Sequence, residues 1–341
     1  MNRNELQQHL KRSPIIKDQM FCGEDLSALA CDKGIFENCD FSQSLLLGAR
    51  LQGSMFRNCQ FDQAQLDGID LKHCVLEECT LNQVTLTGAQ LASALIKRCQ
   101  LTGAQLNGAQ CRNTLFEECD LSDASILQAQ LQKSLITKCT LKETQLCDSL
   151  IESCILSECE LTGLNLQGSF LDKSYLAKQD LRQVKLRGAR LYASKFNECQ
   201  MQQMDLSSLD MPNCCFIQSQ LERANLNKAQ VPYGIFQEAD LTGASLNQTQ
   251  LACSNFDQAK LDGADFTGSN LNMSVMTSAE GQSVTWRDCD CSYSDFSYAR
   301  LSEVDFGQAN LSRARFHRSE LDQVNWQGPG ASGSNGVMRN Y

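Results

Sequence analysis

Histidine, glycine-rich loops and long apolar runs are scarce in this chain, and each scarcity argues against a class of protein. The only histidines are His9, His73 and His317, and no His/Cys spacing is typical of a zinc site. No glycine-rich phosphate loop is visible, and no apolar run approaches the roughly 20 residues that span a bilayer. We therefore expect no enzyme, no cofactor, no metal site and no membrane contact.

Charge and cysteine content point to the cell interior. Acidic residues outnumber basic ones by 40 to 30, which predicts solubility and little direct affinity for nucleic acid. The opening residues, MNRNELQQHLKRSP, are polar, so no secretory signal is expected. The 19 cysteines are more typical of free thiols in a reducing compartment than of disulfides. Together these features predict a cytoplasmic protein.

An apolar residue recurs at every fifth position, a period that suits neither a helix nor a strand. Within Leu95–Leu141 the five-residue period is unbroken. It extends from Leu26 to Trp326 over 61 positions, and all of them except Gly281 hold an apolar residue or Cys. We call this apolar position the central residue. Two residues before it stands a small residue, and 12 of the cysteines occupy that slot, where buried thiols pack as small apolar groups. The missing side chain at Gly281 predicts a local cavity or bend.

A slower period of twenty residues indicates how the units are arranged. Cysteines occupy positions 39, 59, 79, 99, 119, 139 and 159, and Pro212 and Pro232 are also twenty apart. Twenty residues are four units of five, as expected for a four-sided coil whose turns stack in register. Such a repeat architecture buries a continuous core between neighbouring turns.

The repeat resembles the pentapeptide-repeat family, whose unit is a small residue, Asp or Asn, Leu or Phe, and two polar residues. Residues 239–243 (ADLTG), 264–268 (ADFTG) and 309–313 (ANLSR) carry the resemblance. The resemblance implies an all-β fold, a right-handed quadrilateral parallel β-solenoid that forms a rod. We expect an N-terminal cap with a short helix over residues 1–20, the solenoid over 21–326, and a flexible Gly/Ser-rich tail over 327–341.

One outward column is unexpectedly apolar. The residue before the central one is normally polar, yet on eight successive turns it is apolar. These residues are Ile35, Met55, Val75, Leu95, Leu115, Leu135, Ile155 and Tyr175, hereafter the apolar stripe. If exposed, the stripe is roughly 35 Å long and predicts a protein-binding surface. The alternative is that these side chains merely pack along the sheet.

Charged residues suggest two further surface features. One outward column alternates in sign from Glu78 through Arg98 to Glu198, which a solvated ladder explains. A basic band comprises Lys178, Arg182, Lys185, Arg187, Arg190 and Lys195. We take Arg182, Lys185, Arg187 and Arg190 as a weaker candidate for an anionic partner, although most charge runs are only solvated.

Two functions follow from the resemblance. The first is a non-enzymatic scaffold or adaptor that binds proteins, including self-association through the apolar stripe or the open C-terminal coil. Its layout resembles pentapeptide-repeat accessory proteins of bacterial type VI secretion loci. The alternative is a DNA-mimicking binder of gyrase, as in the topoisomerase-protecting members. Mimicry needs a continuous anionic face, which the alternating column and the basic band interrupt.

Overall fold

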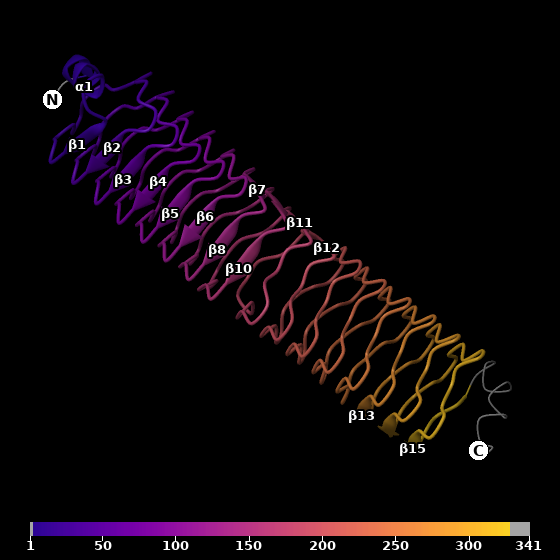
Figure 1. Ribbon diagram of the computed structural model, residues 1–341. Helices are drawn as coiled ribbons and strands as arrows, with labels where there is room; N and C mark the ends of the chain where they lie inside the picture. The colour runs from indigo at the N-terminus through magenta and orange to yellow at the C-terminus, as the bar shows by residue number, and fades with distance from the viewer. Residues whose placement is uncertain (1–2, 328–341) are drawn as a thin grey trace. The chain divides into compact units, whose positions relative to one another are not determined.

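The computed structural model describes residues 3–327 and shows a parallel β-solenoid with one short N-terminal helix, α1 (Arg3–Leu10) (Figure 1). The strands of the described residues are three residues long. They are β1 (Ile15–Lys17), β2 (Ile35–Glu37), β3 (Met55–Arg57), β4 (Val75–Glu77), β5 (Leu95–Lys97), β6 (Leu115–Glu117), β7 (Gln130–Gln132), β8 (Leu135–Thr137), β9 (Leu150–Glu152), β10 (Ile155–Ser157), β11 (Phe170–Asp172), β12 (Arg190–Tyr192), β13 (Glu280–Gln282), β14 (Arg300–Ser302) and β15 (Glu320–Asp322).

Successive coils pair in parallel with an offset of twenty residues. Met55 pairs with Val75 between β3 and β4, and isolated bridges repeat the same offset on the other sides, as between Gln65 and Thr85. Each coil therefore consists of four five-residue sides. The predicted β-solenoid with four-sided turns is confirmed.

Most corners of the coil are turns closed by a backbone hydrogen bond, and these turns explain the five-residue period. At one corner the N–H of Ala64 donates to the carbonyl of Phe61 at 3.0 Å, and Gln63 between them has a φ of 61°. A bond from residue i+3 to residue i with positive φ at i+2 is the pattern of a type II turn. The next central residue then points inward again, five residues after the last.

Central and small residues form the core. Phe36 and Leu101 are 1% exposed, and Ala104 in a small slot is fully buried. Many hydroxyls in the small slot donate to a carbonyl of the preceding coil, as Ser174 does to Ile151 at 2.8 Å. Ser44 and Ser294 instead donate within their own coil. These bonds remove the cost of burying the hydroxyls unpaired.

Two compact units divide the chain, where the unbroken register had suggested one domain. The first unit comprises the residues up to Tyr175 together with Gln183–Lys185, and the second comprises Leu176–Arg182 and the residues from Leu186 onward. In the first unit, β1, β2, β3, β4, β5, β6, β8 and β10 form one parallel sheet in that order.

The predicted boundary of the N-terminal cap needs correction. Residues 1–20 were assigned to the cap, but β1 lies within them and pairs with β2, with Ile15 opposite Ile35. Ile16 already points inward and is 2% exposed. Only α1 lies outside the coils, at the N-terminal end (Figure 1), with its Leu6 fully buried. The predicted tail lies outside the described residues from residue 328 onward.

The second unit is built around stacked aromatic rings. Phe196, Phe216, Phe236 and Phe256 form one column, with neighbouring centroids 4.8–5.4 Å apart. Of the cavity or bend predicted at Gly281, the cavity is wrong and the bend stays a prediction. A Cβ placed on Gly281 would lie 2.6 Å from Cγ2 of Val284, so the larger residue in the adjacent small slot fills the space.

Candidate binding surfaces

The apolar stripe lies on one face of the first unit's sheet. Its residues are paired one after another, from Ile35 with Met55 to Ile155 with Tyr175. Leu95, Leu135, Ile155 and Tyr175 are 36–43% exposed, and the other four members are half-buried. The side chains therefore point outward in a single row. The structure leaves no alternative in which they contribute to the interior.

Ile15 in β1 extends the row by one coil. It pairs with Ile35 and is 42% exposed. Sequence reasoning missed this residue because the five-residue register was traced only from Leu26, whereas Ile15 stands before the inward Ile16 as Ile35 stands before Phe36.

A column of thiols positions the stripe. At the corner that follows it, Cys59 donates to the carbonyls of Phe36 and Arg57, each at 3.4 Å. Cys79, Cys99, Cys119 and Cys139 repeat this pair of contacts. In a closed turn at this corner, the N–H three residues further along the chain would donate to the carbonyl of Phe36. At this corner the thiols donate hydrogen bonds to these carbonyls in place of the turn N–H. The residues just before the corner form a three-residue strand.

Burial keeps two thiols at this corner protonated, so that they can donate. Burial raises the pKa of the Cys159 thiol in this column, and raises that of Cys199, at the equivalent corner of the second unit, to about 11. The described residues contain no group of three or more His, Cys, Asp or Glu side chains arranged to hold a metal ion. The cysteine periodicity thus reflects packing and hydrogen bonding in the core.

Alternating charges border the stripe on its C-terminal side. Two residues after successive stripe positions, Lys17 pairs with Glu37 at 2.5 Å, Arg57 with Glu77 at 3.1 Å, and Lys97 with Glu117 at 2.8 Å. We call the residues two and three positions after each stripe residue the alternating flank. The Arg57 and Arg98 guanidiniums lower the pKa of Glu77, and the Lys97 ammonium lowers that of Glu117.

The opposite border carries charges of both signs. The residues two and three positions before successive stripe residues include the cations Lys33, Lys72, Arg112, Lys133 and Lys173 and the acidic residues Asp32, Glu152 and Asp172. Lys72 contacts Asp70 at 3.6 Å and Lys173 contacts Asp172 at 3.7 Å. Within the described residues, Lys33 and Arg112 are exposed and have no ion-pair partner.

The basic band is divided between the two units and partly neutralised. Lys185 belongs to the first unit and lies 3.6 Å from Glu143. Arg182, in the second unit, holds both carboxylate oxygens of Asp180 at 2.6 and 2.9 Å, which lowers the pKa of Asp180. Arg187 and Arg190 also belong to the second unit. The four candidate residues are thus divided between the two units.

The second unit carries an apolar ridge that sequence reasoning missed. It consists of Tyr233, Cys253, Met273 and Tyr293, one per coil at the same corner. All four have φ between 58° and 60°, and Tyr233, Met273 and Tyr293 are 49–58% exposed. Arg313 lies over the Tyr293 ring at 5.3 Å. Reading every twentieth residue from Tyr233 would have revealed it.

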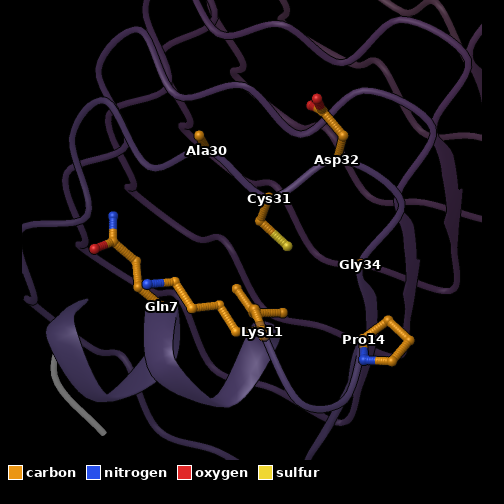
Figure 2. Close-up of a pocket in the computed structure, with 8 residues that line it drawn as sticks. Gln7, Lys11, Pro14, Ala30, Cys31, Asp32 and Gly34 are labelled. Carbon is orange, nitrogen blue, oxygen red and sulfur yellow. The ribbon is translucent and has the colours of Figure 1, made fainter.

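A hollow of about 420 Å³ lies between α1 and the first coil (Figure 2). Gln7 comes from the helix, Lys11 directly follows it, and the Cys31 side chain points toward it. Burial raises the pKa of Cys31 to about 11, and the Asp32 carboxylate points away from the thiol. The hollow therefore brings together no nucleophile and base. The described residues also include no helix long and apolar enough to cross a membrane.

Comparison with known families agrees with the geometry. The family profile described as pentapeptide repeats matches in eight copies, over residues 35–72, 64–99, 98–137, 154–191, 185–227, 235–272 and 289–325. This is well over half of the chain.

The chain belongs to the pentapeptide repeat family. No curated protein sequence matches it. Among solved structures, it is similar to HetL, a pentapeptide repeat protein involved in heterocyst differentiation regulation from Nostoc sp. strain PCC 7120. Their identity is 21%, the TM-score is 0.31, and the match covers 82% of this chain and 96% of HetL.

Two other solved structures are similar to parts of this chain. Full-length QnrB1, a plasmid-mediated fluoroquinolone resistance protein, is 19% identical with a TM-score of 0.30, covering 59% of this chain and 92% of QnrB1. A protein of the Arabidopsis thaliana thylakoid lumen is 22% identical with a TM-score of 0.15, covering 34% and 67%. Values this low transfer no partner to this chain, and none of these relatives points to type VI secretion.

Proposed function

We propose that this pentapeptide repeat protein is a non-enzymatic, protein-binding scaffold whose first unit presents the apolar stripe. The observation that carries the proposal is the outward row of apolar side chains on consecutive strands, from Ile35 to Tyr175. Contiguous exposed apolar surface on a soluble protein tends to mark an interaction site. A flat, hydrogen-bonded sheet holds the row rigid, so little conformational entropy is lost on binding.

The outward position supports a binding role for this stripe. Its members do not contribute to the core, where the neighbouring central residues are already buried. Loss of the stripe should therefore cost binding and leave folding intact.

A triple substitution tests the scaffold proposal. Leu95→Asn, Leu115→Asn and Leu135→Asn replace three stripe residues with the side chain that many repeats carry at this position. The matched control is Gln90→Asn, Gln110→Asn and Gln130→Asn, outward residues of another side of the same unit. Tagged proteins are used for affinity capture from the native cell, with circular dichroism melts as the folding check.

We expect the wild type and the glutamine control to retain the same proteins and the stripe variant to lose them. Equal retention by all three folded proteins would contradict the proposal. Effectors or spike proteins among the retained partners would support the finer assignment to a type VI secretion system, and their absence would remove it.

The charge distribution disfavours the alternative of DNA mimicry. Cations stand between carboxylates along the alternating flank, as Arg57 does beside Glu77, and they break up an anionic face. Purified protein should leave gyrase supercoiling unchanged, and inhibition or protection of gyrase would favour mimicry over the scaffold.

A further inference from the structure

We propose that the chain's own last segment, residues 328–341, binds the C-terminal end of the solenoid and continues the five-residue register over it. The proposal goes beyond the scaffold function and does not involve the apolar stripe. It rests on the exposure of the last described coil and on the sequence of the segment that follows it.

The N-terminal end shows how this chain closes an edge. The helix α1 lies there with Leu6 fully buried. Side chains also occupy backbone groups of the edge strand β1. The N–H of Ile15 donates to Oγ of Ser13 at 3.2 Å, and Nε2 of Gln19 donates to the carbonyl of Lys17 at 3.1 Å. These contacts keep the edge from pairing with another chain.

Burial declines toward the C-terminal end. Phe296 is fully buried, whereas Phe316, twenty residues later, is 8% exposed. The last two central residues, Leu321 and Trp326, are half-buried. A hollow of about 470 Å³ lies against β14 and β15 and is lined in part by Leu321. The last described coil thus presents apolar surface that every inner coil buries.

Backbone groups at this end lack partners as well. In an inner coil the N–H of a central residue donates to the carbonyl nineteen residues further on, as Phe296 does to Arg315 at 2.8 Å. Within residues 3–327 no carbonyl accepts from the N–H of Leu311 or Phe316. The register places the acceptor for Phe316 at Asn335, in the segment that follows.

Glycines of the segment occupy the corner positions of the register. In the described coils every glycine with positive φ lies at a position that ends in 3 or 8, where the chain turns a corner. Gly328 and Gly333 stand at these positions. Glycine adopts positive φ without the steric cost that other residues meet, so both corners are favourable.

Polar residues of the segment match the register too. Ser334 occupies the small slot, and Asn335 occupies the bridging position that Asn325 holds one side of the coil earlier. The N–H of Asn325 donates to the carbonyl of Val304 at 2.9 Å. In the same register the N–H of Asn335 donates to the carbonyl of Ala314. Residues 331–335 are therefore predicted to form one further side of the coil.

The match is partial, which sets how firmly the segment binds. Pro329 and Arg339 occupy small slots and interrupt the pattern there, and the central positions hold the small residues Ala331 and Gly336. The added side therefore supplies backbone pairing and little apolar core, so it should open more readily than an inner coil. Because the segment is joined to the last coil, it binds at a high effective concentration and excludes a second copy.

Hydrogen exchange of the full chain tests the cover. In a variant that ends at Gln327, the amides of Leu311 and Phe316 should exchange faster by roughly tenfold or more than in the full chain. The amide of Phe236, deep in the same unit, is the control and should not change. Equal exchange of the Leu311 and Phe316 amides in the two proteins would overturn the proposal.

Two proline substitutions test the register. Asn335→Pro removes the N–H that donates to Ala314 and should accelerate exchange at Phe316. Ser332→Pro is the matched control, because Pro212 and Pro232 also directly follow central residues, and it should leave this exchange unchanged. Acceleration by both substitutions, or by neither, would contradict the predicted pairing.

Thiol labelling provides a second readout. In a background with Cys22→Ser, Cys147→Ser and Cys253→Ser, Ser334→Cys places a thiol in the small slot, and Ser332→Cys places one at an outward position. A maleimide should modify residue 332 rapidly and residue 334 more slowly. Equal rates would contradict the inward position of residue 334.

The concentration dependence of the exchange identifies the occupant. Protection of the Phe316 amide that stays the same from low to high protein concentration supports the chain's own segment. Protection that rises with protein concentration, and that persists in the variant ending at Gln327, would identify a second copy at this end and overturn the proposal.

Discussion

The two units use the same five-residue pattern and differ at one corner. In the second unit that corner is closed, with the N–H of Ala239 bonded to the carbonyl of Phe236 at 3.0 Å. In the first unit the thiol of Cys59 takes the equivalent carbonyl, that of Phe36. Strands and an outward apolar row accompany the thiols, whereas isolated bridges with Asn255 and Asp295 accompany the closed turns. A cysteine in the small slot thus accompanies a strand with an outward apolar residue, whereas a closed turn accompanies an isolated bridge.

The outward surfaces differ accordingly. The first unit presents a flat row bordered by charges, and the second presents a ridge of Tyr and Met at a corner. A side chain on a three-residue strand lies next to the side chains of the paired strands above and below it. A side chain at a corner is more separated from its neighbours. The first arrangement favours a broad contact with a partner.

Core aromatic residues give the largest expected effect. Phe236→Ala should lower the free energy of unfolding by about 3–5 kcal/mol, because the ring is fully buried between Phe216 and Phe256. Ile96→Val in the first unit is the comparison and should cost about 1 kcal/mol. Urea unfolding of both variants measures the difference, and equal losses would show that the aromatic column adds nothing.

The thiol corner predicts a smaller, local effect. Cys99→Ala should cost about 1–2 kcal/mol, since it removes buried volume and a donor to Leu76 and Lys97. Cys289→Ala is the matched control in the second unit, because the acceptor of its thiol, the Phe266 carbonyl, keeps the closed-turn bond from the N–H of Ser269 at 2.9 Å. Hydrogen exchange should accelerate around β5 in the first variant and change less in the second. Equal changes would break the proposed distinction between the corners.

The strain at the ridge predicts a small gain. Tyr233→Asn should stabilise the second unit by about 0.5 kcal/mol, because Asn tolerates positive φ better than Tyr. Gly68→Ala in the first unit measures the cost of a side chain at such a corner. A Cβ there meets nothing within 4 Å, so the expected loss of about 1 kcal/mol is conformational. A destabilised Tyr233→Asn protein would show that the ring makes stabilising contacts.

The flank ion pairs give the smallest expected effect, and pH reveals it. The pKa of Glu117 is lowered by Lys97, so its contribution is present above about pH 4.3 and is lost as pH falls through the folded value. Lys97→Gln should lower the melting temperature slightly at pH 7 and have no effect near pH 3. A difference that persists at pH 3 would mean that Lys97 acts through packing.

The sequence predicted the coil and the stripe because both depend on periodicity alone. An inward residue every fifth position and a neighbour every twentieth place Leu95 beside Leu115 without any knowledge of side-chain contacts. Ion pairs such as Lys185 with Glu143 depend on rotamers across two coils, so the partial neutralisation of the basic band could not be predicted. Gly281 was misjudged because the effect of a larger neighbour, Val284, was not considered.

The most direct test of this account compares thiol labelling of two adjacent positions. In a background with Cys22→Ser, Cys147→Ser and Cys253→Ser, which removes partly or fully exposed thiols, Leu95→Cys lies on the stripe and Ile96→Cys points into the core. A maleimide should modify residue 95 rapidly and leave residue 96 unmodified in the native state. Equal labelling, or protection of residue 95 alone, would contradict the outward stripe and the scaffold proposal that rests on it.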